Sequence, residues 1–373
     1  MNRMHLESKK KHCHAEQSRS VTIQRRPAPT LLNTTFVQRY LRPWAVVVCL
    51  CVILPLQMFA QEFTIKFATL APEGSTWITI MKEYDAAIRK ESGGRIGFRI
   101  YAGGIAGDEK DVMRKIRLGQ FHAAGVTGFG IGEVARPVRI LDAPFMFKNT
   151  AEVDYILEKF DDEFRKEFEN GGFVLLGWAE VGFVYVFTNT PVAKVADMKS
   201  VKMWEWEGDP VADATFKQFG INPIQLSITD VLTSLQTGLI NGVYTSPLAA
   251  VSLQWFAATK YMMEMPLTNS MGAVIIAKRE FDKMPAELQQ LLLKHGKTYM
   301  RKLTEQSRRD NQKALETLKK NKIHFVKPDP QEVTLYDEIG KRAQQAMVGK
   351  LFSQDLLTRV EKALAEFRSK GGK

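Results

Sequence analysis

Segments with strand-like and helix-like apolar spacing alternate along the chain from Glu62 onward. The first block holds four strand patterns and three helix patterns, which occupy residues 62–68, 75–91, 95–101, 108–118, 121–126, 150–169 and 173–178. Ser75 or Thr76 can cap the first helix, and Gly93-Gly94 ends it. This alternation predicts βαβ units and a mainly parallel sheet.

A second block repeats the pattern further along the chain. We expect strands at residues 184–188, 201–206, around Ile224, 242–244 and 273–277. We expect helices that begin at Pro210 and that occupy residues 229–236, 331–348 and 353–369. Asp209 precedes Pro210, which is a favoured helix start. Between these segments, residues 285–321 have the apolar spacing of one long helix, about 55 Å in length. Such a helix can run along two lobes.

The N-terminal residues have the composition of an export signal. Residues 1–43 are polar and basic, and the apolar run from Trp44 to Ala60 contains Pro55 and is short for a membrane-spanning helix. We expect residues 1–60 to be a signal peptide that is cleaved near Ala60. Its long polar part favours a start of translation near Val37. An uncleaved membrane anchor is the alternative.

Charge and cysteine content agree with an exported soluble body. The leader carries +7 of the net charge of +11, so the other 313 residues carry only +4, with both signs mixed throughout. A nucleic-acid partner is therefore not expected, because such a surface needs clustered Lys and Arg. All three cysteines, Cys13, Cys49 and Cys51, lie in the leader, which excludes disulfides and thiolate sites in the body.

Motifs for catalysis, metals and cofactors are absent from the sequence. The histidines outside the leader, His122, His295 and His324, lack metal-site spacing, and no G-x-S-x-G elbow occurs. Residues 128–132 are glycine-rich without matching a nucleotide-binding pattern, and we expect a loop there whose backbone passes close to another group. We expect no catalytic residue, no metal and no cofactor.

Six phrases, in order, resemble the DctP-type binding subunits of TRAP transporters, and the resemblance covers residues 62–370. They are Ile65-Lys-Phe-Ala-Thr69, the strand 94–101, the loop and helix 107–119, Ala143-Pro-Phe-Met-Phe147, the segment 196–203, and the segment 235–243 followed by Pro247-Leu-Ala. The resemblance implies an α/β periplasmic-binding-protein fold with two lobes, a hinge, and a long helix spanning both lobes. It places lobe I at 61–183 plus about 272–300, and lobe II at 184–271 plus about 301–373.

The function implied by the resemblance is that of a periplasmic receptor, not an enzyme. Such a protein captures a small-molecule ligand between its lobes and delivers it to TRAP membrane permease subunits. The alternative is an interaction protein that docks a periplasmic helper. A subset of these systems with apolar clefts pairs with a tetratricopeptide-repeat protein, and the chain is similar to that subset.

The sequence departs from the family where relatives hold a ligand carboxylate. Trp204 occupies the place of the arginine that grips the acid, and Val184 occupies that of a second arginine. Ser246 replaces an asparagine, and the other aligned cleft positions are Leu70, Thr127 and Ile228. Burying a carboxylate without a counter-charge costs several kcal/mol. We therefore expect a neutral or mainly apolar ligand, such as an aromatic or lipid-like compound.

Further aromatic and acidic side chains are candidates for the same cleft. Trp77, Phe129, Phe187 and Tyr244 can form walls, and Glu109 and Glu205 can contact a polar or cationic end of the ligand. If 204–206 is a strand, Trp204 and Trp206 share one face and Glu205 and Glu207 the other. For Trp77, Phe129, Phe187 and Tyr244, packing in the core remains an equal alternative. Trp204 can also belong to the core, with Lys202 or Arg139 supplying a cation to the cleft.

Overall fold

The computed structural model describes residues 62–371, and the leader with its expected signal peptide lies outside them. A first sheet has the strand order β2-β1-β3-β11-β4. Its strands are β1 (Phe63–Thr69), β2 (Ile96–Tyr101), β3 (Ala123–Val126), β4 (Phe173–Trp178) and β11 (Ala273–Ala277). Strands β1, β2 and β3 are parallel, whereas β11 runs antiparallel to both of its neighbours.

A second sheet is built around β5 (Gly182–Thr188), which pairs antiparallel with three strands. The other strands of this part are β8 (Gly242–Thr245), β9 (Tyr261–Met263), β10 (Thr268–Ser270) and β12 (His324–Val326). A separate parallel pair joins β6 (Trp204–Trp206) to β7 (Ile224–Leu226). The expectation of a mainly parallel sheet is therefore wrong for the second block, because all three ladders with β5 are antiparallel, whereas β9–β12 and β6–β7 are parallel.

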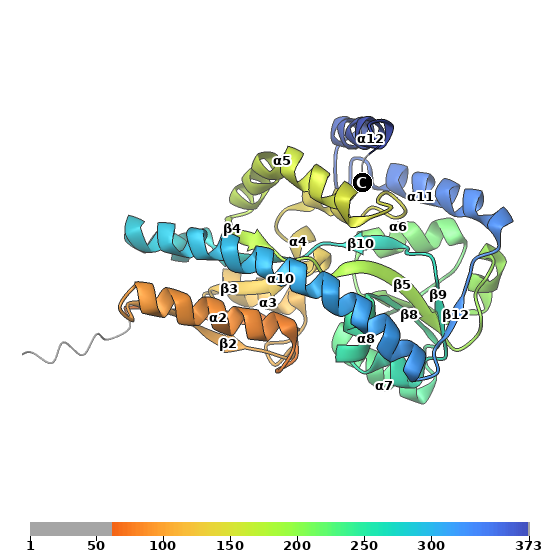
Figure 1. The fold of residues 1–373 in the computed structure, drawn as a ribbon, viewed down its shortest axis with the longest axis horizontal. Coiled ribbons are helices and arrows are strands. Elements are labelled where there is room, and N and C mark those ends of the chain that lie inside the picture. The colour runs from red at the N-terminus through yellow and green to blue at the C-terminus, as the bar shows by residue number, and fades with distance from the viewer. Residues whose placement is uncertain (1–61, 372–373) are drawn as a thin grey trace, which may run out of the picture. The chain divides into compact units, whose positions relative to one another are not determined.

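Helices surround both sheets (Figure 1). They are α2 (Thr76–Glu91), α3 (Glu109–Arg117), α4 (Gly128–Gly132), α5 (Thr150–Asn170), α6 (Pro210–Phe219), α7 (Val231–Thr237), α8 (Pro247–Ser252), α9 (Lys278–Phe281), α10 (Ala286–Lys320), α11 (Val333–Met347) and α12 (Gln354–Ser369). Ser75 caps α2 by accepting from the Ile78 N–H, and Asp209 caps α6 by accepting from the Val211 N–H, as predicted. The loop expected at 128–132 is instead the short helix α4. No described helix has the length and apolar content of a membrane span.

The chain passes directly from a strand of one sheet to a strand of the other at two places, and these two crossings pair with each other. Residues 179–181 lead from β4 to β5, and residues 271–272 lead from β10 to β11. The Ala179 N–H donates to the Gly272 carbonyl at 2.8 Å, and the Val181 N–H donates to the Ser270 carbonyl at 3.1 Å. These paired crossings join the lobes.

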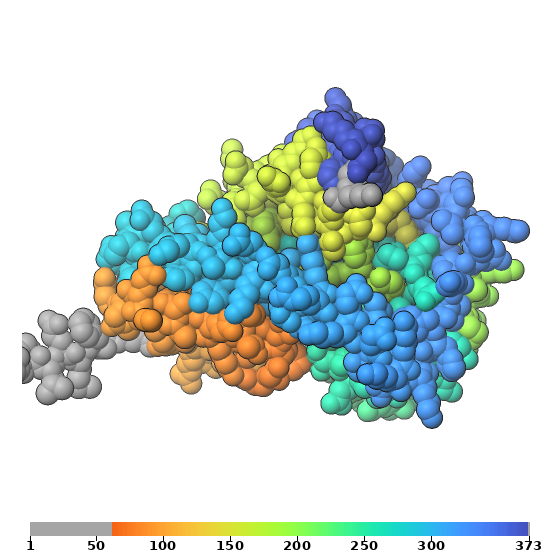
Figure 2. Space-filling model, viewed as in Figure 1, coloured from red at the N-terminus to blue at the C-terminus, as the bar shows by residue number. Residues whose placement is uncertain are grey.

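The 35-residue helix α10 contacts both lobes, as predicted. It packs against α2 and β4 of the first lobe and against α8 and β5 of the second, and it lies continuously over one face of the protein (Figure 2). Asn311 ties this helix to the crossing and to α8, because its side chain donates to the Val181 carbonyl and accepts from the Leu248 N–H.

The C-terminal helices divide between the lobes. Helix α11 packs on α6 in the second lobe, whereas α12 packs on α5 in the first. The ion pairs Arg368–Glu152 and Arg359–Glu163, both at 2.8 Å, join α12 to α5. Residues 353–369, which the sequence analysis placed with the second lobe, thus lie against the first. A buried apolar stripe on α12, centred on Val360, accounts for this packing.

Candidate ligand-binding site

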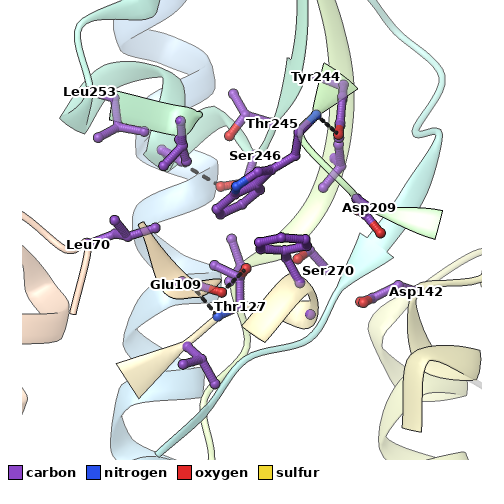
Figure 3. A pocket seen from close by; sticks show the side chains of 18 of the residues that line it. Leu70, Glu109, Thr127, Asp142, Asp209, Tyr244, Thr245, Ser246, Leu253 and Ser270 are labelled. Carbon is purple, nitrogen blue, oxygen red and sulfur yellow. Dashed lines mark hydrogen bonds between the residues drawn. The ribbon is translucent and has the colours of Figure 1, made fainter. Parts of the chain in front are cut away.

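A mostly apolar cavity of about 200 Å³ lies between the lobes (Figure 3). Its first-lobe wall comes from the segments that follow β1 and β3, including Leu70 and Thr127. Its second-lobe wall comes from β6 and from residues 244–246 at the end of β8. Chain segments at strand ends commonly form binding crevices in α/β proteins. This cavity is therefore the candidate ligand site.

Trp204 lies in the wall of this cavity and is 1% exposed. Its ring stacks on Tyr244 with centroids 4.9 Å apart and meets Trp255 edge-on at 5.3 Å. The indole N–H donates to the Leu226 carbonyl at 3.0 Å. Trp204 is therefore both a core residue and a wall residue, and it can offer a ligand ring surface but not its N–H.

Trp206 reaches across to the first lobe. It lies on the same face of β6 as Trp204, with ring centroids 5.9 Å apart, and it stacks on Phe129 of α4 at 4.7 Å. Its indole N–H donates to the Asp108 carboxylate at 3.0 Å. Asp108 also accepts from the Ser227 hydroxyl at 2.6 Å and the Ile228 N–H at 3.1 Å. One carboxylate of the first lobe thus holds three groups of the second.

Glu109 is buried in the first-lobe wall and organises the turn after β3. Its carboxylate accepts from the Thr127 N–H at 2.8 Å, the Thr127 hydroxyl at 3.0 Å and the Gly130 N–H at 2.7 Å. A Cβ on Gly130 would lie 2.6 Å from a Glu109 carboxylate oxygen and 2.7 Å from the Val126 Cβ, so any larger residue there would force the wall to shift. Burial raises the pKa of the Glu109 carboxyl to about 7, against the opposing effect of these hydrogen bonds.

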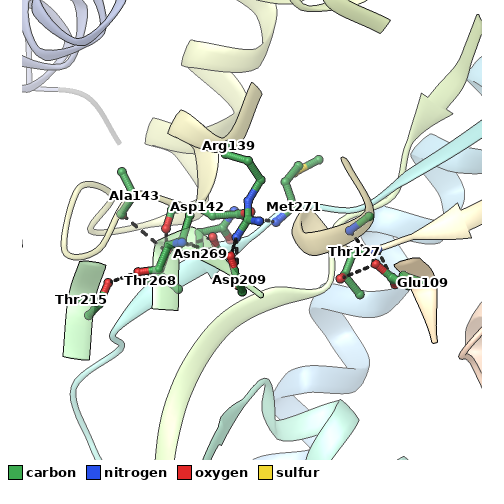
Figure 4. A network of polar contacts seen from close by, with 12 residues as sticks. Glu109, Thr127, Arg139, Asp142, Ala143, Asp209, Thr215, Thr268, Asn269 and Met271 are labelled. Carbon is green, nitrogen blue, oxygen red and sulfur yellow. Dashed lines mark hydrogen bonds and ion pairs between the residues drawn. The ribbon is translucent and has the colours of Figure 1, made fainter. Parts of the chain in front are cut away.

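Arg139 also lines the cavity, but carboxylates surround it (Figure 4). Its Nε donates to Asp142 at 2.8 Å, and its Nη2 pairs with Asp209 of the second lobe at 3.0 Å. The third nitrogen, Nη1, has no hydrogen-bond partner among the described residues and lies close to Gly132. Asp142 further accepts from the Met271 N–H at 2.9 Å. Burial raises the pKa of its carboxyl to about 6, while Arg139 opposes the rise.

Most of the residues that sequence reasoning named come together in this cavity. Those in its lining are Leu70, Trp77, Glu109, Thr127, Phe129, Val184, Trp204, Ile228, Tyr244 and Ser246. The Ser246 hydroxyl caps α8 by accepting from the Ala249 N–H at 3.2 Å. The Tyr244 hydroxyl accepts from the backbone N–H of Trp206 at 3.2 Å. Contact of any of these side chains with a ligand stays a prediction.

Three residues suggested for the cleft lie elsewhere. Phe187 follows Val184 by three positions on β5, so it faces the opposite side of the strand and packs in the core. Glu205 points away from Trp204 and accepts from the Gln225 amide at 2.7 Å. Lys202 is exposed and donates to the Gly238 carbonyl. Of the two cations proposed as substitutes, Arg139 alone lines the cavity.

The sequence analysis did not assign Asp142, Asp209 or Trp255 to the site. Asp209 was recognisable only as a helix cap, and Asp142 directly precedes the segment 143–147 that was noted only for resemblance. The described lining contains one guanidinium, that of Arg139, and three carboxyl groups, those of Glu109, Asp142 and Asp209. The described residues contain no cluster of His, Cys, Asp and Glu suited to a metal ion.

These features define a two-lobed solute-binding protein of the periplasmic type. The sequence model of the DctP family, described as "Bacterial extracellular solute-binding protein, family 7", matches residues 67–350. The chain therefore belongs to this family. It is a periplasmic solute-binding receptor of the TRAP transport class and acts in transport without catalysing a reaction.

Relatives and solved structures agree with this assignment. The 2,3-diketo-L-gulonate-binding periplasmic protein YiaO of Escherichia coli is 27% identical over 277 residues, which cover 72% of this chain and 81% of YiaO. A TRAP solute-binding protein from Desulfovibrio salexigens with bound orotic acid has a TM-score of 0.76 at 16% identity, covering 81% of this chain and 99% of that one. One from Haemophilus influenzae with bound L-gulonate has a TM-score of 0.76 at 20% identity, covering 82% and 99%.

Proposed function

We propose that this receptor captures a neutral or largely apolar small molecule between its lobes, and not the carboxylates that relatives hold. The observation that carries the proposal is the pairing of Arg139, the one cation in the described lining, with both Asp142 and Asp209. Trp204 stands where the resemblance predicts the acid-binding arginine. An incoming carboxylate would thus meet ring surfaces and further acids, and its desolvation would be uncompensated.

The proposal departs from what the relatives' ligands would suggest. YiaO is named for a sugar acid, and the two structures hold orotic acid and L-gulonate. An acid needs a guanidinium or ammonium that is free to pair with it. In this cavity the guanidinium has already two acidic partners, so the apolar rings around Trp204 supply the main contact area.

Cavity size narrows the ligand further. An apolar cavity of about 150 Å³ is large enough to take up benzene. The cavity of about 200 Å³ therefore suits a compound of about one substituted ring. A long-chain lipid would require the lobes to move further apart.

Native mass spectrometry on protein purified without refolding, followed by solvent extraction, tests this proposal. We expect a co-purifying molecule without a carboxylate. Trp204→Phe should lower its occupancy, whereas Trp178→Phe, which changes a tryptophan outside the cavity, should retain it. Recovery of a sugar acid or dicarboxylate as the bound species would contradict the proposal and leave the family assignment intact.

We further propose that TRAP permease subunits receive the ligand and that residues 1–60 are removed on export. N-terminal sequencing of the periplasmic protein tests the second statement, since a start beyond Gln61 or an intact leader would contradict it. Docking of a tetratricopeptide-repeat helper remains the alternative role. Co-purification of such a protein from the native host, with the apolar ligand, would favour it.

A further inference from the structure

We infer that the ligand carries a positively charged nitrogen on its small apolar body, so that the cavity takes an organic cation such as an aromatic amine. This inference rests on the proposed function, because it refines the ligand class of the same cavity. It follows from two features together: an excess of buried carboxyl groups and a wall of aromatic rings whose polar atoms are already engaged.

The carboxyl groups that line the cavity outnumber the cations that line it. Glu109, Asp142 and Asp209 are each at most 5% exposed and all line the cavity, with Arg139 as the only cation among the described lining residues. If all three carboxyl groups are ionised, two negative charges are left uncompensated. Buried charge without a counter-charge is costly, and a bound cation would relieve that cost.

Arg139 does not make the cavity suited to an anionic ligand. Its Nε and Nη2 already pair with Asp142 and Asp209. The third nitrogen, Nη1, is buried beside Gly132, which does not line the cavity. A carboxylate bound beside Arg139 would be the third acid around one guanidinium, whereas an ammonium beside Asp142 or Asp209 would complete an alternating arrangement of charges.

The aromatic walls also favour a cation. The indole N–H of Trp204 donates to the Leu226 carbonyl, and the indole N–H of Trp206 donates to the Asp108 carboxylate. Neither indole N–H is therefore free to donate to an anionic ligand. What remains for the ligand is ring surface from Trp204, Trp206, Phe129 and Tyr244. Ring faces attract organic cations, and the attraction is stronger where water is excluded.

A cation should bind more weakly at low pH. Burial raises the pKa of the Glu109 carboxyl to about 7 and that of Asp142 to about 6, so both take up protons as the pH falls from 7.5 to 5.5. The other charged groups facing them are Asp108 beside Glu109, and Arg139 and Asp209 beside Asp142. A bound ammonium favours the ionised carboxylates, and acidification therefore removes its partners.

Three probes with the same ring separate the possibilities: 2-phenylethylamine, 2-phenylethanol and 3-phenylpropionate. Isothermal titration calorimetry on the ligand-stripped full-length mature protein should give binding of the amine at least tenfold tighter than that of the alcohol, and no measurable binding of the acid. The amine's affinity should fall several-fold between pH 7.5 and 5.5, while that of the alcohol should stay unchanged.

Matched variants locate the effect. Asp142→Asn should weaken amine binding about tenfold and alcohol binding far less, whereas Glu205→Gln, which alters a buried carboxyl outside the cavity, should change neither. If Asp142→Asn fails to fold, Glu109→Gln replaces it, with a smaller loss of amine affinity expected.

Equal binding of amine and alcohol, or no binding of any probe at millimolar concentration, overturns the cation inference and leaves the proposed function standing. Tighter binding of the acid overturns both.

Discussion

Trp204 and Glu109 illustrate how single residues serve the core and the cavity at once. Trp204 belongs to the second lobe's hydrophobic cluster and also to the cavity wall. Glu109 accepts three hydrogen bonds that hold the turn after β3, yet burial makes its ionised form unfavourable. The cavity is therefore lined by groups that are already constrained before a ligand arrives, which lowers the ordering cost of binding.

The raised pKa of Glu109 predicts how this residue affects stability as pH changes. Between the ordinary value of 4.5 and about 7, the folded protein keeps a proton that the unfolded chain releases. Stability from this group therefore falls as the pH rises through that window. Glu109→Gln cannot titrate, so the free energy of unfolding of the native protein relative to this variant should fall by about 3 kcal/mol between pH 4.5 and 7.5.

Urea denaturation of the two proteins across this pH range measures the effect. The variant Glu207→Gln provides the control, because Glu207 is exposed, and its stability should follow that of the native protein at every pH. A constant difference between native protein and Glu109→Gln would show that the buried carboxyl does not hold its proton.

At the scale of elements, α10 is positioned by close backbone contact as well as by its apolar stripe. Leu288, Leu292 and Leu303 face the core of the first lobe. The Tyr84 hydroxyl of α2 donates to the Leu292 carbonyl at 2.8 Å. Where α10 crosses β4, Gly296 lies directly against the Leu176 carbonyl, and a Cβ there would overlap it. The helix can therefore pass close to the strand only at a glycine.

Gly296→Ala should consequently destabilise the protein, although alanine is about 1 kcal/mol better than glycine in a free helix. We expect a loss of about 2 kcal/mol or more in the free energy of unfolding, because backbone atoms of β4 would have to move. Lys297→Ala, at the next and exposed position of the same helix, should change stability by less than about 0.5 kcal/mol. A stabilised Gly296→Ala variant would exclude the close approach.

For the whole molecule, the lobes are joined by paired crossings and by side chains that meet across the cavity. Asp108 holds Trp206, Ser227 and Ile228, and Arg139 holds Asp209. The crossings at 179–181 and 271–272 are where a hinge motion can be absorbed. The polar contacts around the cavity favour the arrangement in which the lobes touch.

Asp108→Ala should therefore shift the protein toward separated lobes. Although Asp108 stands at the start of α3, its side chain makes no capping hydrogen bond, so the helix itself should be unaffected. Loss of three bonds to a carboxylate should weaken closure by about 2 kcal/mol or more. Small-angle X-ray scattering should show a larger radius of gyration for this variant.

Asp111→Ala is the matched control, since Asp111 lies on the same helix and pairs only with exposed Arg114. Its scattering should equal that of the native protein. Indistinguishable scattering from both variants would mean that Asp108 does not hold the lobes together.

Local spacing was sufficient to predict most elements of the fold. Strands β4 and β11 lie at the predicted residues, and α10 differs by about one residue at each end from prediction. Such patterns report on each segment's own apolar face. The three-residue strands β9, β10 and β12 carry too few residues to show a period, and their pairing depends on β5 and on one another.

The sequence by itself determined the alternation of elements, the export leader as an expectation, and the presence of Trp204 at a position where the family keeps an arginine. Only the tertiary structure decided that Arg139, Asp142 and Asp209, which are up to 70 residues apart, share one network. It also turned Phe187 into the core and Glu205 away from the cavity. The physical reason is that charge balance and side-chain direction in a cavity depend on which segments meet, and the contacts between distant segments are not contained in the spacing of any one of them.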